Sequence, residues 1–133
     1  MRAVIDTNIL VSALLTPSGV SAQVIAAMRS QALVPVISQN ILEEYMEVLF
    51  RPRFGFKRDE IVSLLMDMKG LALFLNPQSI LLQGLPDPDD APFIATALTA
   101  GCVIITGNKK HFPPEIGVKI FSPAEVLLRL QSL

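Results

Sequence analysis

The chain has 133 residues, of which 51 % are hydrophobic and 17 % are charged, and its 11 basic and 12 acidic residues give a formal net charge of −1. This composition excludes a disordered chain, and the length suits one domain that spans residues 1–133. The single cysteine, Cys102, excludes a disulfide scaffold and is typical of a reduced intracellular protein. Because the charges nearly balance, attraction for nucleic acid must come from a local basic surface.

Neither a membrane span nor a secretory leader is expected. Residues 1–22 loosely resemble a signal peptide, but Asp6 and Asn8 stand where its hydrophobic region would begin. The apolar stretch 61–75 contains charged residues and is shorter than the roughly 20 apolar residues that a membrane helix needs. We therefore expect a cytoplasmic protein with no membrane partner.

Strand and helix patterns alternate along the whole chain. Short β-rich runs alternate with apolar residues at helical spacing, and proline, serine or glycine stands at many of the boundaries. In chain order, the patterns predict a strand at residues 2–6, a helix at 9–15, a helix that starts after Ser18 or Ser21 and ends near 31, a strand at 33–37, a helix at 39–50, a helix at 59–69, a strand at 71–75, a helix at 90–100, strands at 103–106 and 118–121, and a helix at 123–130.

This alternation predicts an α/β protein. The expected architecture is a three-layer α/β/α sandwich with a central parallel sheet of about four or five strands, covered by helices on both faces. Right-handed crossovers place the carboxyl ends of all strands at one edge of such a sheet, and this edge usually holds the functional site.

Acidic residues stand where this fold would gather them. Asp6 ends the first strand, Glu44 lies on the helix after the second strand, and the cluster Asp87-Pro88-Asp89-Asp90 precedes the helix at residues 90–100. A carboxylate beside the apolar run of the first strand is costly to bury unless it is paired or bound to a metal. We expect Asp6, Glu44 and Asp90 to converge at the sheet edge.

Each acid also has a purely structural explanation. Asp6 and Asp90 could cap the helices that follow them, which would leave part of the Asp87–Asp90 cluster unexplained. Glu43, Glu44 and Glu47 could form a solvated helix face. We favour that explanation for Glu43 and Glu47, which point away from the apolar face, whereas Glu44 borders it and both interpretations stay open.

Converging carboxylates imply a particular chemistry. Their charges repel unless a cation neutralises them, and hard oxygen ligands without a cluster of cysteine or histidine select Mg²⁺ or Mn²⁺. Such an ion lowers the pKa of a bound water molecule and stabilises charge that develops on a phosphoryl oxygen. Asp6, Glu44 and Asp90 are therefore the candidate catalytic and metal-binding residues for phosphodiester hydrolysis.

Four segments, in this order, resemble PIN-domain ribonucleases. They are Val4-Ile5-Asp6-Thr7-Asn8-Ile9-Leu10, the stretch from Ser38 through Glu43-Glu44-Tyr45 to Arg51-Pro52, Asp87-Pro88-Asp89-Asp90 with Phe93-Ile94-Ala95, and Ile105-Thr106-Gly107-Asn108. The similarity covers nearly the whole chain and is greatest to toxins of bacterial and archaeal toxin–antitoxin pairs, such as VapC. It implies an Mg²⁺- or Mn²⁺-dependent endonuclease that cuts single-stranded RNA, is often a homodimer and is often silenced by an antitoxin protein.

The resemblance also assigns residues. Asp6, Glu44 and Asp90 match the core acids of the family, and Asn8 matches the polar residue beside the first of them. At the fourth acidic position many members have aspartate, whereas this chain has Asn108, a neutral ligand. Asp87 and Asn108 are thus additional candidate metal ligands, and a one-metal mechanism is favoured over a two-metal one.

Substrate contacts are expected around the same edge. The candidates are Asn8, Thr106, Asn108, Lys109 and Lys110, of which the two lysines suit phosphate contact because their loop follows the fourth strand. His111 could contact RNA, but in a proline-flanked loop we favour a structural role. A second basic group, Arg51, Arg53, Lys57 and Arg58, lies in the loop between two helices, and for Arg58 ordinary solvated surface is favoured.

Two alternative functions stay open. Asn108 is compatible with a catalytically weak PIN-like module that binds RNA or a partner protein. A phosphoacceptor receiver domain shares the doubly wound sheet, but it needs an acidic pair after the first strand and an aspartate after the third. Here the first strand offers only Asp6, and the third ends in Asn76-Pro77.

Overall fold

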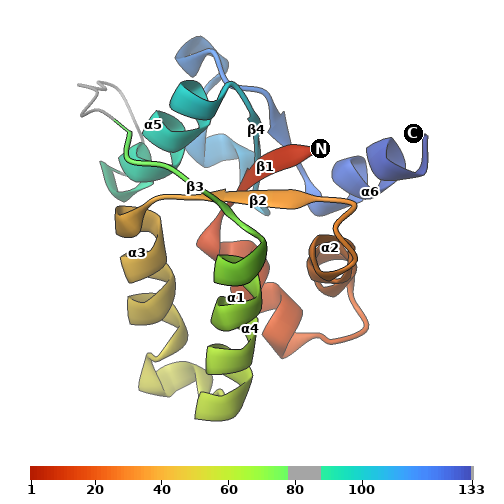
Figure 1. The fold of residues 1–133 in the computed structure, drawn as a ribbon, viewed down its shortest axis with the longest axis vertical. Helices are drawn as coiled ribbons and strands as arrows, with labels where there is room; N and C mark the ends of the chain where they lie inside the picture. Colours follow the sequence, from red (N-terminus) through yellow and green to blue (C-terminus); the bar gives the residue numbers. More distant parts are fainter. Residues whose placement is uncertain (78–87, 133) are drawn as a thin grey trace.

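The computed structural model describes residues 1–77 and 88–132. Its centre is a parallel sheet of five strands in the order β3-β2-β1-β4-β5 (Figure 1). The strands are β1 (Arg2–Ile5), β2 (Val34–Ile37), β3 (Leu73–Phe74), β4 (Val103–Ile105) and β5 (Ile120–Phe121). The predicted parallel sheet is therefore confirmed, with five strands. The candidate ligand Asp87 lies outside the described residues.

Strand β1 forms the middle of the sheet. Ala3 pairs with Pro35 of β2 on one side and with Val103 of β4 on the other. Ala3, Val4 and Ile5 are fully buried, as expected for a parallel strand that is covered on both faces. Because β1 and β4 are in register, the residues that follow them, Asp6 and Thr106, emerge side by side at the carboxyl edge.

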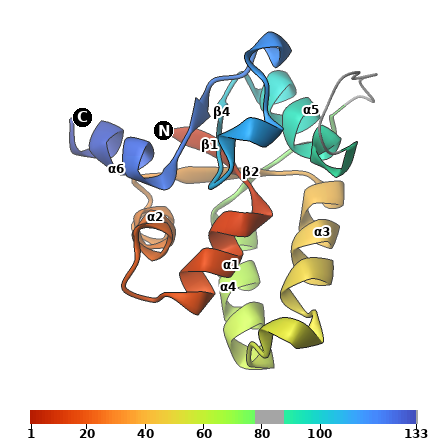
Figure 2. The same ribbon diagram turned by 180° about the vertical axis from the view of Figure 1, so that it is seen from behind.

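The helices form the two outer layers. They are α1 (Thr7–Leu15), α2 (Val20–Arg29), α3 (Gln39–Leu49), α4 (Arg58–Leu71), α5 (Ala91–Ala100) and α6 (Pro123–Gln131). Helices α1 to α4 lie on one side of the sheet and α5 on the other, and α6 contacts α2 and β5 (Figures 1 and 2). The predicted three layers are confirmed.

Within 1–77 and 88–132, no single helix is long and apolar enough to cross a membrane. Helices α1 and α2 pass such a test only when they are taken together, and the chain bends by 107° between them.

Several predicted boundaries were wrong, and β5 (Ile120–Phe121) is two residues shorter than the predicted 118–121. Helix α1 begins at Thr7 rather than at residue 9, because the backbone of Asp6 already serves as its N-cap. Helix α4 runs through Gly70 to Leu71, so β3 has two residues instead of the predicted 71–75. Strand β3 pairs only with β2 at the edge of the sheet, where few ladder bonds favour a longer strand over another helical turn.

Tyr45 fixes α3 against the sheet. Its hydroxyl donates a hydrogen bond of 2.5 Å to the carbonyl oxygen of Ile5, the last residue of β1. The side chain is fully buried, and its ring centroid lies 6.4 Å from that of Phe93 in α5. Burial raises the pKa of Tyr45 well above its ordinary value, so the hydroxyl stays protonated and available as a donor. This contact sets the position of its neighbour, Glu44.

Candidate functional site

Asp6 is held by the strand beside its own. Its backbone N–H donates to the carbonyl of Ile105, at 2.9 Å, and its carboxylate accepts a hydrogen bond of 2.7 Å from the hydroxyl of Thr106. The side chain is only 6 % exposed and makes no capping hydrogen bond to α1 in the described part of the chain. Helix capping therefore does not explain this buried carboxylate.

Thr106 is the centre of a small hydrogen-bond network. Its hydroxyl oxygen also lies 3.0 Å from the backbone nitrogen of Asn108 and 3.4 Å from Nδ2 of Asn8, and both of these nitrogens act as donors. Asn8 in turn accepts a hydrogen bond of 3.1 Å from the backbone N–H of Gly107. Thr106 was expected to bind substrate, but it is fully buried, so its contacts instead orient Asp6 and the loop after β4.

The side chain of Glu44 also lies toward the carboxyl edge of the sheet, where Asp6 is held. The N-cap Ser38 starts α3 by accepting a hydrogen bond of 3.2 Å from the backbone N–H of Ile41, and two turns of helix later Glu44 lies half-buried. Its carboxylate accepts a hydrogen bond of 2.5 Å from the hydroxyl of Thr7, the residue after Asp6. The structure thus brings Glu44 to the N-terminus of α1, whereas Glu43 and Glu47 are exposed.

The charge environment of Glu44 is unfavourable to a carboxylate. Burial raises its pKa above the ordinary value, and the nearby negative charges of Asp6 and Asp89 raise it further, while the Thr7 hydrogen bond opposes this. A cation at this edge would reverse the effect. The pKa shift therefore indicates that Asp6, Glu44 and Asp89 share one electrostatic environment.

Asp90 stands at the start of α5 and is also only 6 % exposed. Its Oδ2 lies 3.4 Å from Nδ1 of His111, which belongs to a short 3₁₀ turn (Lys109–His111) after β4. In both ribbon views the start of α5 lies beside the start of α3 (Figures 1 and 2). His111, for which a structural role was favoured, therefore contacts a candidate catalytic acid.

An acidic hollow of about 390 Å³ opens between α3 and the start of α5. Its charged lining residues are Glu43, Glu44, Glu47 and Asp89. Two of these acids have further partners, since Glu43 accepts a hydrogen bond from Gln39 and Glu47 forms an ion pair of 2.8 Å with Arg51. The hollow concentrates negative charge where a cation could enter.

The donor chemistry of this edge fits a hard divalent cation, because the candidate ligands are carboxylate and amide oxygens. However, no three side chains of aspartate, glutamate, histidine or cysteine within 1–77 and 88–132 form a ready metal site. Thr7 holds the Glu44 carboxylate, and like charges keep apart without a cation. Asp6, Glu44 and Asp90 therefore share the carboxyl edge of the sheet, but they do not form a complete set of metal ligands.

The basic residues divide into two groups. Lys110, two residues after Asn108, is exposed, whereas Lys109 forms an ion pair with Glu125 at the start of α6. The Lys109 hydrogen bond, together with the Ser122 backbone, lowers the pKa of Glu125 to about 2. Lys110 is thus the lysine available to a phosphate.

The loop at 51–58 lies at the end of α3 that is remote from the sheet (Figure 1). Arg51 is paired with Glu47, and the guanidinium groups of Arg53 and Arg58 lie 4.8 Å and 5.9 Å from phenylalanine ring centroids. Arg51 therefore contacts the acidic hollow through Glu47, whereas Arg53 and Arg58 are stacked on phenylalanine rings.

Sequence reasoning gave no role to Thr7 or to the Tyr45 hydroxyl. The first holds Glu44 and the second holds α3 against β1. A signal for Thr7 was present, since a hydroxyl directly after a strand-end aspartate, at the start of a helix, faces the same edge as that aspartate. No comparable signal identifies the partner of Tyr45, because a lone tyrosine on an apolar helix face also suits simple core packing.

Comparison with known protein sequences identifies a family and a relative. The family model described as PIN domain matches residues 2–110. Uncharacterized protein MJ1680 of Methanocaldococcus jannaschii is 28 % identical over 112 residues, which cover 82 % of this chain and 72 % of that protein.

Two solved structures are similar in fold. VapBC2 from Rickettsia felis, bound to a DNA fragment from the promoter, aligns with a TM-score of 0.63 and 14 % identity over 92 % of this chain and 98 % of the other. VapBC-1 from nontypeable Haemophilus influenzae aligns with a TM-score of 0.61 and 17 % identity over 93 % and 99 %.

Proposed function

We propose that this chain, which belongs to the PIN-domain family of nucleases, is a metal-dependent endoribonuclease that hydrolyses phosphodiester bonds in single-stranded RNA. The observation that carries the proposal is the pair of Asp6 and Glu44, which come from different elements and are held at one edge by Thr106 and Thr7. Two partly or fully buried carboxylates in one electrostatic environment are unfavourable unless the site serves a cation.

Asp6, Glu44 and Asp90 would hold Mg²⁺ or Mn²⁺, with Asn108 as a further candidate ligand. The bound ion would lower the pKa of a water molecule and stabilise negative charge on the phosphoryl group. Thr106 fixes one Asp6 oxygen, so this carboxylate needs little reorganisation during the reaction. Glu44 must leave the Thr7 hydroxyl or share its carboxylate with it.

The remaining side chains would position the RNA. Lys110, which is exposed two residues after Asn108, would pair with a phosphate as a point charge. Asn8 and the backbone of Gly107 close the loop that presents Lys110 and Asn108. His111 would keep the Asp90 carboxylate directed toward the edge.

Cleavage of a labelled single-stranded RNA by purified protein in Mn²⁺ tests this proposal. The Asp6→Asn variant should lose activity by at least about 100-fold, because a metal ligand loses its charge. The matched control is Asp59→Asn, an exposed carboxylate in the first turn of α4, which should cleave like the wild type. Equal cleavage by wild type and Asp6→Asn would identify a contaminant.

A catalytically weak module that binds RNA or a protein is the second candidate, and Asn108 in place of an acid favours it. Titration calorimetry with Mn²⁺ separates the two candidates. Binding to the wild type that is lost in Asp6→Asn supports the enzyme. RNA binding without any Mn²⁺ binding supports the module.

We further propose that the protein acts in the cytoplasm as the toxin of a toxin–antitoxin pair, as a homodimer with an antitoxin partner. The fold shared with two VapBC structures supports this proposal. Co-expression with the protein encoded beside it should give one complex on gel filtration, and RNA cleavage should stop in that complex. Separate elution of the two proteins would contradict the pairing.

A further inference from the structure

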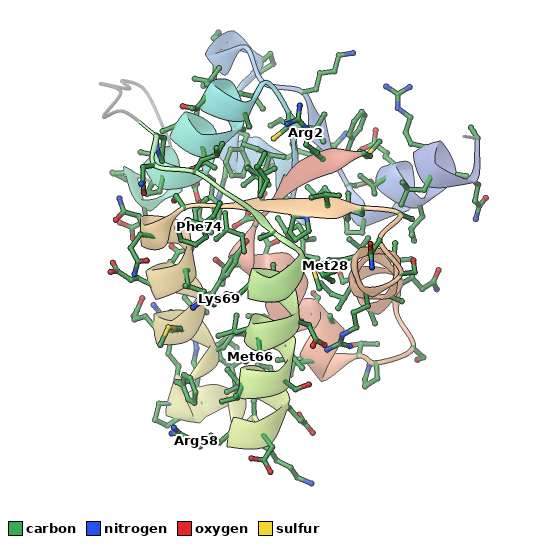
Figure 3. All side chains as sticks on the ribbon, in the orientation of Figure 1. Arg2, Met28, Arg58, Met66, Lys69 and Phe74 are labelled. Atoms are coloured by element: carbon green, nitrogen blue, oxygen red, sulfur yellow. The ribbon has the colours of Figure 1, made fainter. Side chains whose placement is uncertain are left out.

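The loop between α3 and α4, residues 50–57, brings three planar groups together. The guanidinium of Arg53 lies 4.8 Å from the centroid of the Phe54 ring, over its face. The ring of Phe54 stacks on that of Phe56, with centroids 5.3 Å apart and an angle of 8° between the planes. We call these three side chains the Arg53–Phe56 stack. Figure 3 labels Arg58, the first residue of α4, at the end of this helix that is remote from the sheet, and the loop leads into that end.

The backbone of the loop explains why the two rings meet. Pro52–Phe54 form a turn of 3₁₀ helix, and the backbone N–H of Gly55 donates a hydrogen bond of 3.1 Å to the carbonyl oxygen of Pro52. Gly55 then has a φ of 62°, in the left-handed region that favours glycine, so the chain turns between Phe54 and Phe56. Phe56 packs against the hydrophobic core and thereby anchors the stack.

The exposed side of the loop is basic. Arg53 and Lys57 are exposed, and within residues 1–77 and 88–132 neither of them forms an ion pair. No acidic residue stands between residues 50 and 58 of the sequence. Because the whole chain has a net charge of −1, only a local surface of this kind attracts a polyanion.

Arg53 can bind a further planar group. A guanidinium is planar and has two faces, and the contact with Phe54 covers no more than one of them. The bases of a single strand expose their faces and stack on aromatic rings or on guanidinium planes, whereas a duplex hides these faces. A carboxylate instead accepts hydrogen bonds at the edge of the guanidinium, so an acidic peptide makes no use of the face.

We propose that residues 51–57 form a second contact site for single-stranded RNA, outside the acidic hollow. One base stacks on the guanidinium of Arg53, and Lys57 pairs with a neighbouring phosphate. The proposal rests on RNA as the proposed substrate, but it needs neither a bound metal ion nor cleavage.

An RNA strand can reach this site and the acidic hollow together. Glu44 lies roughly 8 Å along the helix axis from Leu49, the last residue of α3. At roughly 3.4 Å per nucleotide, a strand of more than about four nucleotides spans this part of the helix and part of the loop. Arg51, which is paired with Glu47 at 2.8 Å, offsets one of the negative charges of the hollow at this end of α3.

Fluorescence anisotropy in EDTA, with the full chain and two fluorescein-labelled probes, tests this site. One probe is a strand of about 12 adenylates, and the other has the same ribose–phosphate backbone without bases. Arg53→Lys keeps the charge but removes the planar group, so it should weaken binding of the adenylate strand at least about fivefold and leave the abasic strand unchanged. Lys57→Gln should weaken binding of both probes by the same factor and reduce the salt dependence of binding.

Arg129→Lys is the matched control. Arg129 is exposed and lies 5.2 Å over the ring of Phe121, but it belongs to α6, which lies away from this loop in both ribbon views (Figures 1 and 2). This variant should bind both probes like the wild type. Circular dichroism checks that each variant folds.

The absence of binding between the wild type and the adenylate strand would overturn the proposal. The same holds for an unchanged affinity of Arg53→Lys, an equal loss for both probes in that variant, an equal loss in Arg129→Lys, or a labelled glutamate peptide that binds as tightly as the adenylate strand. The proposed nuclease fails separately. If the wild type cuts no RNA in Mn²⁺, a selective loss of adenylate binding in Arg53→Lys still supports this contact site.

Discussion

Asp6 and Asp90 are equally buried, at 6 % exposure each, but they are positioned in different ways. Asp6 follows a central strand and is held at 2.7 Å by Thr106 from the neighbouring strand, so sheet register fixes it. Asp90 stands at the start of a helix, and its contact with His111, at 3.4 Å, comes from a short turn whose histidine is 39 % exposed. We infer that sheet register preorganises the Asp6 side of the site, whereas the His111 contact to Asp90 depends on the turn after β4.

The largest effect on metal binding and cleavage should come from removal of the Thr106 hydroxyl, which holds Asp6. Thr106→Val keeps the shape of the side chain but removes the hydrogen bond that the Thr106 hydroxyl donates to Asp6. Mn²⁺ affinity in calorimetry and RNA cleavage should both fall by roughly 10- to 100-fold, the range typical of lost contacts behind a metal ligand. Thr106→Ser restores the hydroxyl and should recover most of both. An unchanged Mn²⁺ affinity in Thr106→Val would show that sheet register alone fixes Asp6.

Removal of the His111 side chain, on the Asp90 side of the site, should lower RNA cleavage by less. His111→Ala removes a contact to Asp90 that is longer, at 3.4 Å, than the 2.7 Å hydrogen bond from Thr106 to Asp6, so cleavage should fall by less than about tenfold. His111→Gln, which retains a polar group at this position, serves as its control. A loss as large as that of Thr106→Val would show that both halves are equally dependent on fixed partners.

The smallest effect concerns stability in the absence of metal. The pKa of Glu44 is raised in the folded protein, so folding disfavours the charged form of this side chain. The protonated carboxyl therefore stabilises the fold at pH values below the ordinary pKa of 4.5, and this stabilisation is lost as the pH rises through the raised pKa. Glu44→Gln keeps an acceptor for Thr7 and removes the charge. Its melting temperature at pH 7 should exceed that of the wild type by roughly 1–3 °C.

This advantage should disappear below about pH 4.5, where the wild-type carboxyl is protonated as well. Saturating Mn²⁺ should reverse the order at pH 7, because only the wild type gains from full metal binding. Scanning calorimetry across this pH range measures both effects. A melting temperature of Glu44→Gln below that of the wild type at pH 7 without metal would show that the Glu44 charge stabilises the fold.

Some of these features could be predicted from the sequence because they follow from chain connectivity. Alternating strand and helix patterns imply a parallel sheet, and such a sheet gathers strand-end residues such as Asp6 and Thr106 at one edge. The orientation of Glu44 could not be predicted, because it depends on Thr7 and Tyr45, whose partners lie 37 and 40 residues away in the chain.

The same limit applies to the basic residues and to the surface between α3 and α4. Lys109 pairs with Glu125 only because the turn after β4 packs beside the start of α6. A hollow of about 420 Å³ between α3 and α4 arises because the two helices lie side by side, and the apolar residues that each contributes are, in the sequence alone, indistinguishable from ordinary surface. These contacts depend on tertiary packing, which the periodicity of the sequence does not encode.

A crystal structure determined after soaking in Mn²⁺ tests the central claim most directly. We expect an anomalous peak at the carboxyl edge, within about 2.0–2.3 Å of oxygens of Asp6, Glu44 and Asp90. It would also show whether Asn108 is a ligand. The absence of a peak at this edge at saturating Mn²⁺, or a peak that none of these three carboxylates contacts, would contradict the account.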